Sequence, residues 1–228
     1  MTGWLALVGG EEWTDGCSFD RDLLEAAEVR RVLVVPAAAA FENFRRLLER
    51  AERWFEALGA EMDVLEVFRR EDAMDEKNAG KVSGAGLIYL CDGGSMHLRS
   101  VLKDSLVWKA CLEAWRSGAV LAGSGAGADV LCDPMVDPRG GAFTVGLGLL
   151  HRLSVIPRFD SWSHEKIHRT VTLAPPDVVL AGIPNGTALI RRADGSWYAS
   201  GVGEVELFRA GQPVGLEVLE GVRVDGSS

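Results

Sequence analysis

The stretch from Val120 to Pro134 contains residue types and spacings that fit a catalytic turn. Its sequence, VLAGSGAGADVLCDP, predicts a short buried strand, a turn of small residues at Gly123–Gly127 and the start of a helix at Ala128–Cys132. A strand, a sharp turn and a helix form the nucleophile elbow of G-x-S-x-G proteins, where glycines flank the nucleophile because strand and helix pass too close for a Cβ. Gly125 stands at the middle position, so the sequence predicts the frame of an elbow without its reactive atom. The alternative interpretation is a helix N-terminus whose small residues serve packing.

Two other groups offer rival chemistry. Ser124 lies one residue before the nucleophile position, and could act only in a rearranged turn; otherwise its hydroxyl bonds to nearby backbone. The run His164-Glu165-Lys166-Ile167-His168 matches HExxH, which on a helix places two histidines on one face to bind zinc, with the glutamate as general base. Its surroundings are rich in loops and supply no obvious third ligand. A polar surface helix with Ile167 packed inward is therefore the alternative, and we expect no metal there.

Two turns could present groups to a ligand. Asp92-Gly93-Gly94 lies between a predicted strand and a predicted helix, where backbone N–H groups can bind an anion or an oxyanion. Glu11 follows the first predicted strand and could place a carboxylate near the same ligand. A plain tight turn and a solvated loop are the respective alternatives. His97 and His151 lie in apolar surroundings, and we interpret them as packing residues.

The elements that must position these residues alternate along the first part of the chain. Continuous apolar runs predict strands buried on both faces, and apolar residues at helical spacing predict the helices between them. The predicted strands are Trp4–Val8, Arg31–Pro36, Met62–Val67, Gly86–Leu90 and Val120–Ala122. The predicted helices are Asp20–Glu28, Phe41–Leu58, Asp72–Ala79, Met96–Asp104 and Leu106–Ser117. Alternating strands and helices imply a parallel sheet covered on both faces.

The second part of the chain has a different pattern. Asp133–Leu150 is rich in glycine and proline and predicts loops with one short strand, and Ser163 is expected to cap a short helix that reaches Thr170. Later segments alternate apolar and polar residues, with a hairpin turn at Asp194-Gly195. We expect antiparallel strands at Val178–Ala181, Thr187–Arg191, Trp197–Ser200 and Glu204–Phe208. The fold class is thus α/β, a mostly parallel sheet with helices on both faces and antiparallel strands at the C-terminal end. We expect one domain over residues 1–224 and a disordered tail at 225–228.

Composition bounds the kind of partner. The 228 residues carry a net charge of −9, which argues against nucleic acid and anionic membranes. The N-terminal residues have no basic region before an apolar run, and the longest apolar run is too short to span a bilayer, so we expect neither a signal peptide nor a membrane segment. The four cysteines are widely spaced, as expected for reduced thiols in a cytoplasmic protein. We expect no cofactor, and a homodimer is compatible with the sequence.

The chain resembles the dipeptidase E and cyanophycinase-like serine peptidases, which have a class I glutamine amidotransferase-like, flavodoxin-like fold. The resemblance covers the chain from Gly9 to about Phe208. It rests on the glycine turn Asp92–Gly94, GSGAGA at Gly123–Ala128, DPMVDPRG at Asp133–Gly140, GLGLL at Gly146–Leu150 and VIPRFDSW at Val155–Trp162.

The resemblance implies the site residues. The nucleophilic serine of the family falls on Gly125 and the catalytic histidine on Arg158. Asp133 is the nearest match for the acidic member, with Asp137 as the alternative. The oxyanion donors would be the backbone N–H groups of Gly94 or Gly93 and of Ala126, and Glu11 and Ser124 are candidate substrate-binding residues.

Two triad positions therefore depart from the family pattern. A serine peptidase needs an oxygen nucleophile and a base, but glycine has no side chain and arginine stays protonated. We expect a catalytically degenerate protein that binds a small peptide-like or acidic ligand, or a protein partner. An active hydrolase that uses Ser124, or a metal at His164 and His168, is the alternative. We also expect Arg158 to form an ion pair with Asp133 or Asp137 in place of the His–Asp contact of a triad.

Overall fold

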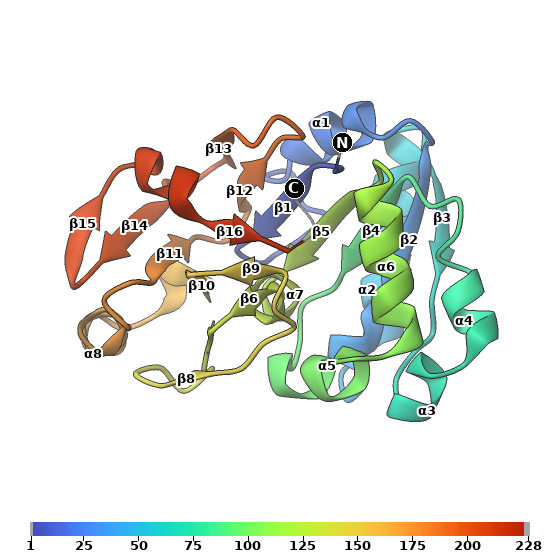
Figure 1. Ribbon diagram of the computed structural model, residues 1–228. Coiled ribbons are helices and arrows are strands. Elements are labelled where there is room, and N and C mark those ends of the chain that lie inside the picture. Colours follow the sequence, from blue (N-terminus) through green and yellow to red (C-terminus); the bar gives the residue numbers. More distant parts are fainter. Residues whose placement is uncertain (1, 226–228) are drawn as a thin grey trace.

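The computed structural model describes residues 2–225 and is organised around a seven-stranded sheet (Figure 1). The strand order is β13-β12-β1-β5-β4-β2-β3; the five strands from β1 to β3 run parallel, and β12 and β13 are antiparallel additions at the β1 edge. The strands are β1 Leu5–Val8, β2 Arg31–Val35, β3 Glu61–Val64, β4 Leu87–Leu90, β5 Val120–Ser124, β12 Thr187–Arg191 and β13 Trp197–Gly201. This arrangement confirms the α/β class with a mostly parallel sheet and antiparallel strands near the C-terminal end.

Helices cover both faces of this sheet because its strands are apolar on both faces. Alternate residues of β4 enter different clusters: Ile88 and Leu90 pack with α6, whereas Leu87 and Tyr89 pack with α1 and α2. Figure 1 shows α6 and α2 on opposite sides of the sheet. The helices of this part are α1 Phe19–Ala26, α2 Phe44–Ala57, α3 Arg70–Ala73, α4 Glu76–Gly80, α5 Ser95–Leu102, α6 Leu106–Arg116 and α7 Ala126–Leu131.

Most differences from the predicted elements are shifts of their ends. The predicted helix Phe41–Leu58 begins at Phe44, because Pro36–Ala39 forms a separate 3-10 helix, η1, and Asn43 caps α2 by accepting a hydrogen bond from the Arg46 N–H at 3.5 Å. The single helix predicted at Asp72–Ala79 is two short helices, α3 and α4. Asp75 separates them, since its side chain accepts from the Lys77 N–H at 2.8 Å and starts a new helix.

The larger difference is a second sheet that the sequence did not predict as a unit. Its order is β10-β11-β14-β15, and β10 pairs with β11 in parallel, so the segment near Val178 is not purely antiparallel as expected. The strands are β10 Leu153–Pro157, β11 Val179–Ile183, β14 Glu206–Arg209 and β15 Gln212–Val214. Helix α8, His164–Leu173, is the crossover between β10 and β11, and η2, Phe159–Ser161, precedes it. Strand β10 ends beside the elbow, so Arg158, the residue that follows it, lies at the site.

Short paired segments complete the chain. The region predicted as loops with one short strand contains β6 Cys132–Asp133, β7 Met135–Val136, β8 Phe143–Thr144 and β9 Leu150–His151, while η3 Leu216–Gly221 and β16 Arg223–Val224 lie near the C-terminus. Asp225 of the predicted disordered tail is described, and its N–H donates to the Leu149 carbonyl at 2.8 Å. Residues 226–228 lie outside the described part. Within residues 2–225, no helix combines the length and apolarity needed to cross a bilayer.

Candidate active site

The predicted elbow lies at the end of β5, the central strand of the seven-stranded sheet. Gly125 has φ 52° and ψ −108°, and α7 begins at the next residue. Its N–H donates to the Val8 carbonyl at 2.9 Å, which ties the turn to the neighbouring strand β1. A Cβ on Gly123 would lie 2.4 Å from the backbone carbonyl of Gly127, so strand and helix touch here through backbone alone. The predicted order of strand, turn and helix is present, but β5 extends to Ser124 and α7 begins at Ala126, so the turn is shorter than the predicted Gly123–Gly127.

The carboxylate of Asp92 fills the space in front of the elbow. Asp92 follows β4 and is buried. A Cβ built on Gly125 would lie 2.0 Å from Cγ of Asp92, a distance at which atoms cannot coexist. This position of the Asp92 side chain consequently requires glycine at position 125.

Two backbone N–H groups converge on one oxygen of Asp92. Oδ1 accepts hydrogen bonds from the N–H of Gly93 at 2.7 Å and from the N–H of Ala126 at 2.9 Å. These are two of the predicted oxyanion donors, and the third, Gly94, donates its N–H to the Ala38 carbonyl at 2.9 Å. The pair that faces the elbow is thus Gly93 and Ala126. A side-chain carboxylate lies where they could bind an oxyanion.

The other oxygen of Asp92 pairs with Arg158. The guanidinium Nη2 of Arg158 forms an ion pair with Oδ2 of Asp92, and 52% of the Arg158 side chain is exposed. Arg158 follows directly after β10 in a left-handed conformation, φ 51° and ψ 42°, and its N–H donates to the Gly9 carbonyl at 2.7 Å. The backbone contact to Gly9 holds this strained conformation and directs the guanidinium to the elbow.

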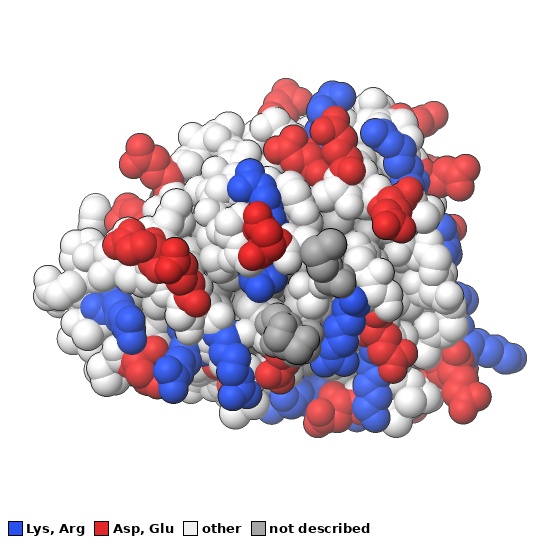
Figure 2. All heavy atoms as spheres, turned by 45° about the horizontal axis from the view of Figure 1, so that its top comes forward, with Lys and Arg blue, Asp and Glu red and all other residues white. Residues whose placement is uncertain are grey.

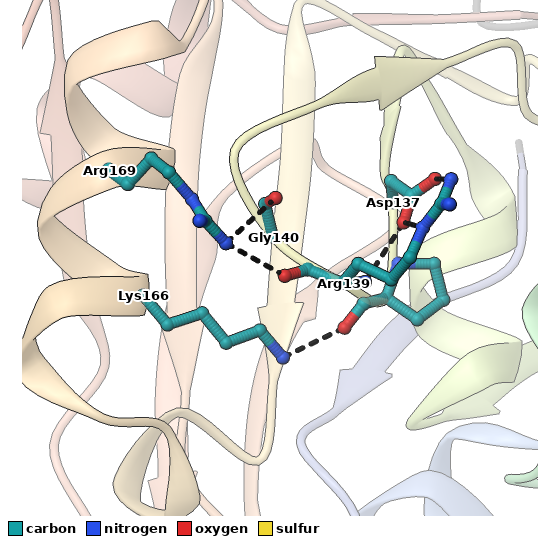
Figure 3. A network of polar contacts seen from close by, with 6 residues as sticks. Asp137, Arg139, Gly140, Lys166 and Arg169 are labelled. Carbon is teal, nitrogen blue, oxygen red and sulfur yellow. Dashed lines mark hydrogen bonds and ion pairs between the residues drawn. The ribbon is translucent and has the colours of Figure 1, made fainter.

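This ion pair corrects the expectation that Arg158 would pair with Asp133 or Asp137. Asp137 instead pairs with Arg139 at 2.7 Å, and the hydrogen bonds from Arg139 lower the pKa of Asp137 to about 2 (Figure 3). Asp133 lines a different cleft, together with His151 and Arg152. The reason is topological. The chain after α7 leaves the elbow through β6, whereas Asp92 comes from β4, the neighbour of β5 in the sheet.

Glu12 lies beneath the elbow and was not among the predicted site residues. Its carboxylate accepts the Ser124 hydroxyl at 2.8 Å through Oε2 and the Asp92 N–H at 3.2 Å through Oε1. Burial, and then the charge of Asp92, raises the pKa of Glu12. Positive φ angles at Glu11 (51°) and Trp13 (61°) turn the loop so that Glu12 points inward. The only sequence signal was a glutamate beside the exposed Glu11, and spacing could not tell which of the two faces the core.

The environment of Ser124 bears on the alternative nucleophile. Ser124 is fully buried. We expected its hydroxyl to bond to nearby backbone, but it donates to the Glu12 carboxylate. Ser124 lines neither of the two clefts that border the elbow.

Those two clefts lie on either side of the Asp92–Arg158 ion pair. The first, of about 230 Å³, is lined by Glu11, Glu42 and Arg50 among others. The second, of about 180 Å³, is lined by Ser95, Trp162 and Lys166 among others. Asp92 and Arg158 line both, so the ion pair forms the wall between them.

A buried acid, Asp129, lines the second cleft. It is on α7, and its Oδ1 accepts the Val136 N–H at 2.9 Å. Burial raises the pKa of Asp129 to about 8, although hydrogen bonds from Val136 and Ser95 oppose the shift. The raised pKa of Asp129 favours its neutral carboxylic acid form, which adds no charge against an anionic ligand.

Helix α8 forms the outer wall of the second cleft. Lys166 lies 3.3 Å from the centre of the Trp162 ring. Lys166 also donates to the Pro138 carbonyl at 2.8 Å, and Arg169 donates to the Arg139 carbonyl at 3.1 Å (Figure 3). Lys166 and Arg169 thereby fix the loop that carries Asp137.

The histidines have surroundings of their own. His164 and His168 of the HExxH run are on α8, both exposed, with Ser163 capping the helix as expected through a 3.3 Å bond from the Lys166 N–H. Across residues 2–225, no three His, Cys, Asp or Glu side chains gather in a group that could hold a metal ion. His97 bonds to the Phe68 carbonyl at 3.0 Å, and His151 pairs with Asp225 at 3.2 Å.

An elbow in a parallel sheet, amide donors from two turns and a cleft on each side define a peptidase-like hydrolase fold. The chain belongs to peptidase family S51, whose sequence profile matches residues 9–196. It is similar to the cyanophycinases of Synechococcus elongatus and Thermosynechococcus vestitus, each 27% identical over 159 residues that cover 64% of this chain and 49% of the relative. The chain thus spans about half the length of these curated relatives.

Two solved structures share the fold. A peptidase from an acI-B1 Actinobacterium is 30% identical, with a TM-score of 0.83 over 92% of both chains. A putative peptidase E protein from Listeria monocytogenes EGD-e, 18% identical, has a TM-score of 0.67 over 89% of this chain and 100% of that one, and shows the fold alone. The predicted resemblance to dipeptidase E and cyanophycinase-like peptidases is confirmed at the level of the family.

Proposed function

We propose that this protein is a family S51 member without acyl-transfer activity, which binds a small acidic or peptide-like ligand at the elbow. One observation carries the proposal. The residue that the family resemblance places at the nucleophile position is Gly125, and the space in front of it is filled by a carboxylate that an arginine holds in place. A nucleophile and a base are both required for acyl transfer, and neither Gly125 nor Arg158 can supply one.

The same geometry supports a binding role. Gly93, Ala126 and Arg158 together hold the carboxylate of Asp92 with two N–H bonds and an ion pair. Charge-assisted hydrogen bonds of this kind are the stronger ones that proteins use for carboxylate recognition. The clefts of about 230 and 180 Å³ on either side suit a ligand the size of a short peptide.

The acidic character of the chain is compatible with this role. The net charge is −9, and on the face drawn in Figure 2 acidic and basic side chains are interspersed. Recognition of an acidic ligand therefore depends on local cations, of which Arg158 lies in both clefts.

A test combines turnover, labelling and binding. We expect no hydrolysis of short acidic peptides and no covalent labelling by a fluorophosphonate serine probe, but saturable binding of an acidic dipeptide in calorimetry. Replacing Arg158 by Glu places like charges together and should abolish this binding. Arg152→Glu is the matched control: Arg152 is also an exposed arginine with positive φ, 65°, and the variant has the same net charge.

Each result is decisive. Turnover by the wild-type protein would contradict the proposal and favour the alternative of an active hydrolase with unorthodox residues. Absence of binding to every acidic peptide tested, or equal affinity of the Arg158→Glu and Arg152→Glu variants, would contradict the assigned ligand class or its place.

A further inference from the structure

We infer that Asp92 is an internal competitor at a carboxylate-binding site, and that a small carboxylate ligand binds by replacing the Asp92 side chain on Gly93, Ala126 and Arg158. The inference rests on the proposed binding role at the same elbow and specifies its ligand and its mode of binding.

The contacts of Asp92 define the site. One of its oxygens lies within 2.7 and 2.9 Å of two backbone nitrogens that come from different turns, and the other pairs with a guanidinium. The three contacts together engage both oxygens of the planar carboxylate. The three groups are two backbone N–H donors and a guanidinium, and they can bond to any carboxylate. A carboxylate from another molecule can therefore take the place of the Asp92 side chain.

The surroundings allow the side chain to leave. The Asp92 side chain is 10% exposed, and it forms the wall between two clefts, each of which could receive it after rotation. Its main chain is fixed independently, because its N–H donates to Glu12 at 3.2 Å. Exchange therefore needs a side-chain rotation and leaves the backbone in place.

The position of Gly125 gives the exchange its specificity. A Cβ on residue 125 would lie 2.0 Å from the Asp92 Cγ. Because glycine has no Cβ, this space is open to a carboxylate, whichever molecule provides it. A free monocarboxylate and the terminal carboxylate of a peptide share this chemistry. A tetrahedral anion such as phosphate has further oxygens to place in a space that holds a planar carboxylate, and we expect it to bind more weakly.

The competition has a measurable size. A binding-competent state that is populated at 1 to 10% weakens the apparent affinity by about 10- to 100-fold, and removal of the competing group restores it. Asp92→Ala should therefore bind acetate at least about tenfold more tightly than the wild-type protein. Asp92→Asn, whose amide cannot form the ion pair with Arg158, should fall between the two.

The experiment follows the backbone amide signals of Gly93 and Ala126 in a 15N NMR titration with sodium acetate at constant ionic strength. Sodium phosphate is the tetrahedral comparison, and N-acetyl-dialanine, whose chain would enter a cleft, separates a peptide source from a free acid. Asp63→Ala is the matched control, since it removes an aspartate from another arginine pair, Arg31–Asp63 at 2.6 Å, on the far edge of the sheet.

We expect both amide signals to shift with acetate in Asp92→Ala and much less in the wild-type and Asp63→Ala proteins. Unshifted signals in Asp92→Ala, or in Asp92→Asn if the alanine variant does not fold, would overturn the inference, as would equal acetate affinity of variant and wild type. Stronger binding of phosphate than of acetate would overturn the assigned ligand class. Peptide turnover by the wild-type protein would end the proposed function and leave this result unaffected.

Discussion

Substitution of Gly125 by Ala should destabilise the protein by more than the backbone conformation alone explains. A non-glycine residue at positive φ costs about 1 kcal/mol. The new Cβ would also lie 2.0 Å from Cγ and Oδ1 of Asp92, so the carboxylate must leave. Its two N–H bonds are each worth about 1.5 kcal/mol when the acceptor is charged. The sum is about 4 kcal/mol, and water in the adjoining clefts offsets part of it, so we expect a loss of about 2–4 kcal/mol.

A double-mutant cycle isolates the contribution of Asp92. In an Asp92→Ala background the clashing atoms are gone, and Gly125→Ala should cost only about 1 kcal/mol in urea unfolding. Gly211→Ala is the matched control for backbone strain, since Gly211 has φ 77° and a Cβ there meets nothing within 4 Å. Equal costs of Gly125→Ala in the two backgrounds, or a cost no larger than that of Gly211→Ala, would refute the reasoning.

Three further predictions concern a restored nucleophile and base, a buried acid and the histidine pair. Gly125→Ser alone should remain inactive in a peptidase screen because Arg158 cannot take the proton of the serine, whereas Gly125→Ser with Arg158→His, in which the new Cβ also displaces the Asp92 carboxylate, should hydrolyse short acidic peptides; activity of the single variant would contradict the need for a base at position 158. Burial raises the pKa of Asp20 to about 8, so wild-type stability should fall as the pH rises from about 4 to 8. Asp20→Asn should flatten that fall in urea unfolding, and a slope unchanged from the exposed control Asp22→Asn would count against it. Elemental analysis of untagged protein should find no stoichiometric zinc, and one zinc per chain that is lost in His168→Ala would reverse this.

The sequence was informative where the signal is local. Strands such as Arg31–Val35 and Thr187–Arg191 are recognisable because buried apolar runs and turn residues lie next to each other in the chain. The elbow was predicted for the same reason, as strand, turn and helix occupy consecutive positions. The parallel pairing of β10 with β11 depends on a crossover through α8 and on burial against the rest of the chain, which local patterns do not record.

The contacts of the site were harder to predict because they join distant positions. Asp92 lies 34 residues from Ala126 and 66 from Arg158, and the sequence showed it only as the residue before a glycine pair. The absence of a side chain at Gly125 indicated that another group could fill the turn, but the sequence did not identify that group as Asp92. Glu12, 112 residues from Ser124, is a similar case.

The contact between α8 and the loop at 138–141 has a consequence for how freely that loop can vary. The loop offers main-chain groups to the helix: the carbonyls of Pro138, Arg139 and Gly140 accept from side chains of α8, and the Gly141 N–H donates to the Thr170 hydroxyl at 2.9 Å. Every residue type supplies a carbonyl. The side chain of Arg139 can therefore change during evolution while the loop stays bound to α8. A change in the α8 residues whose side chains bond to the loop would remove these contacts.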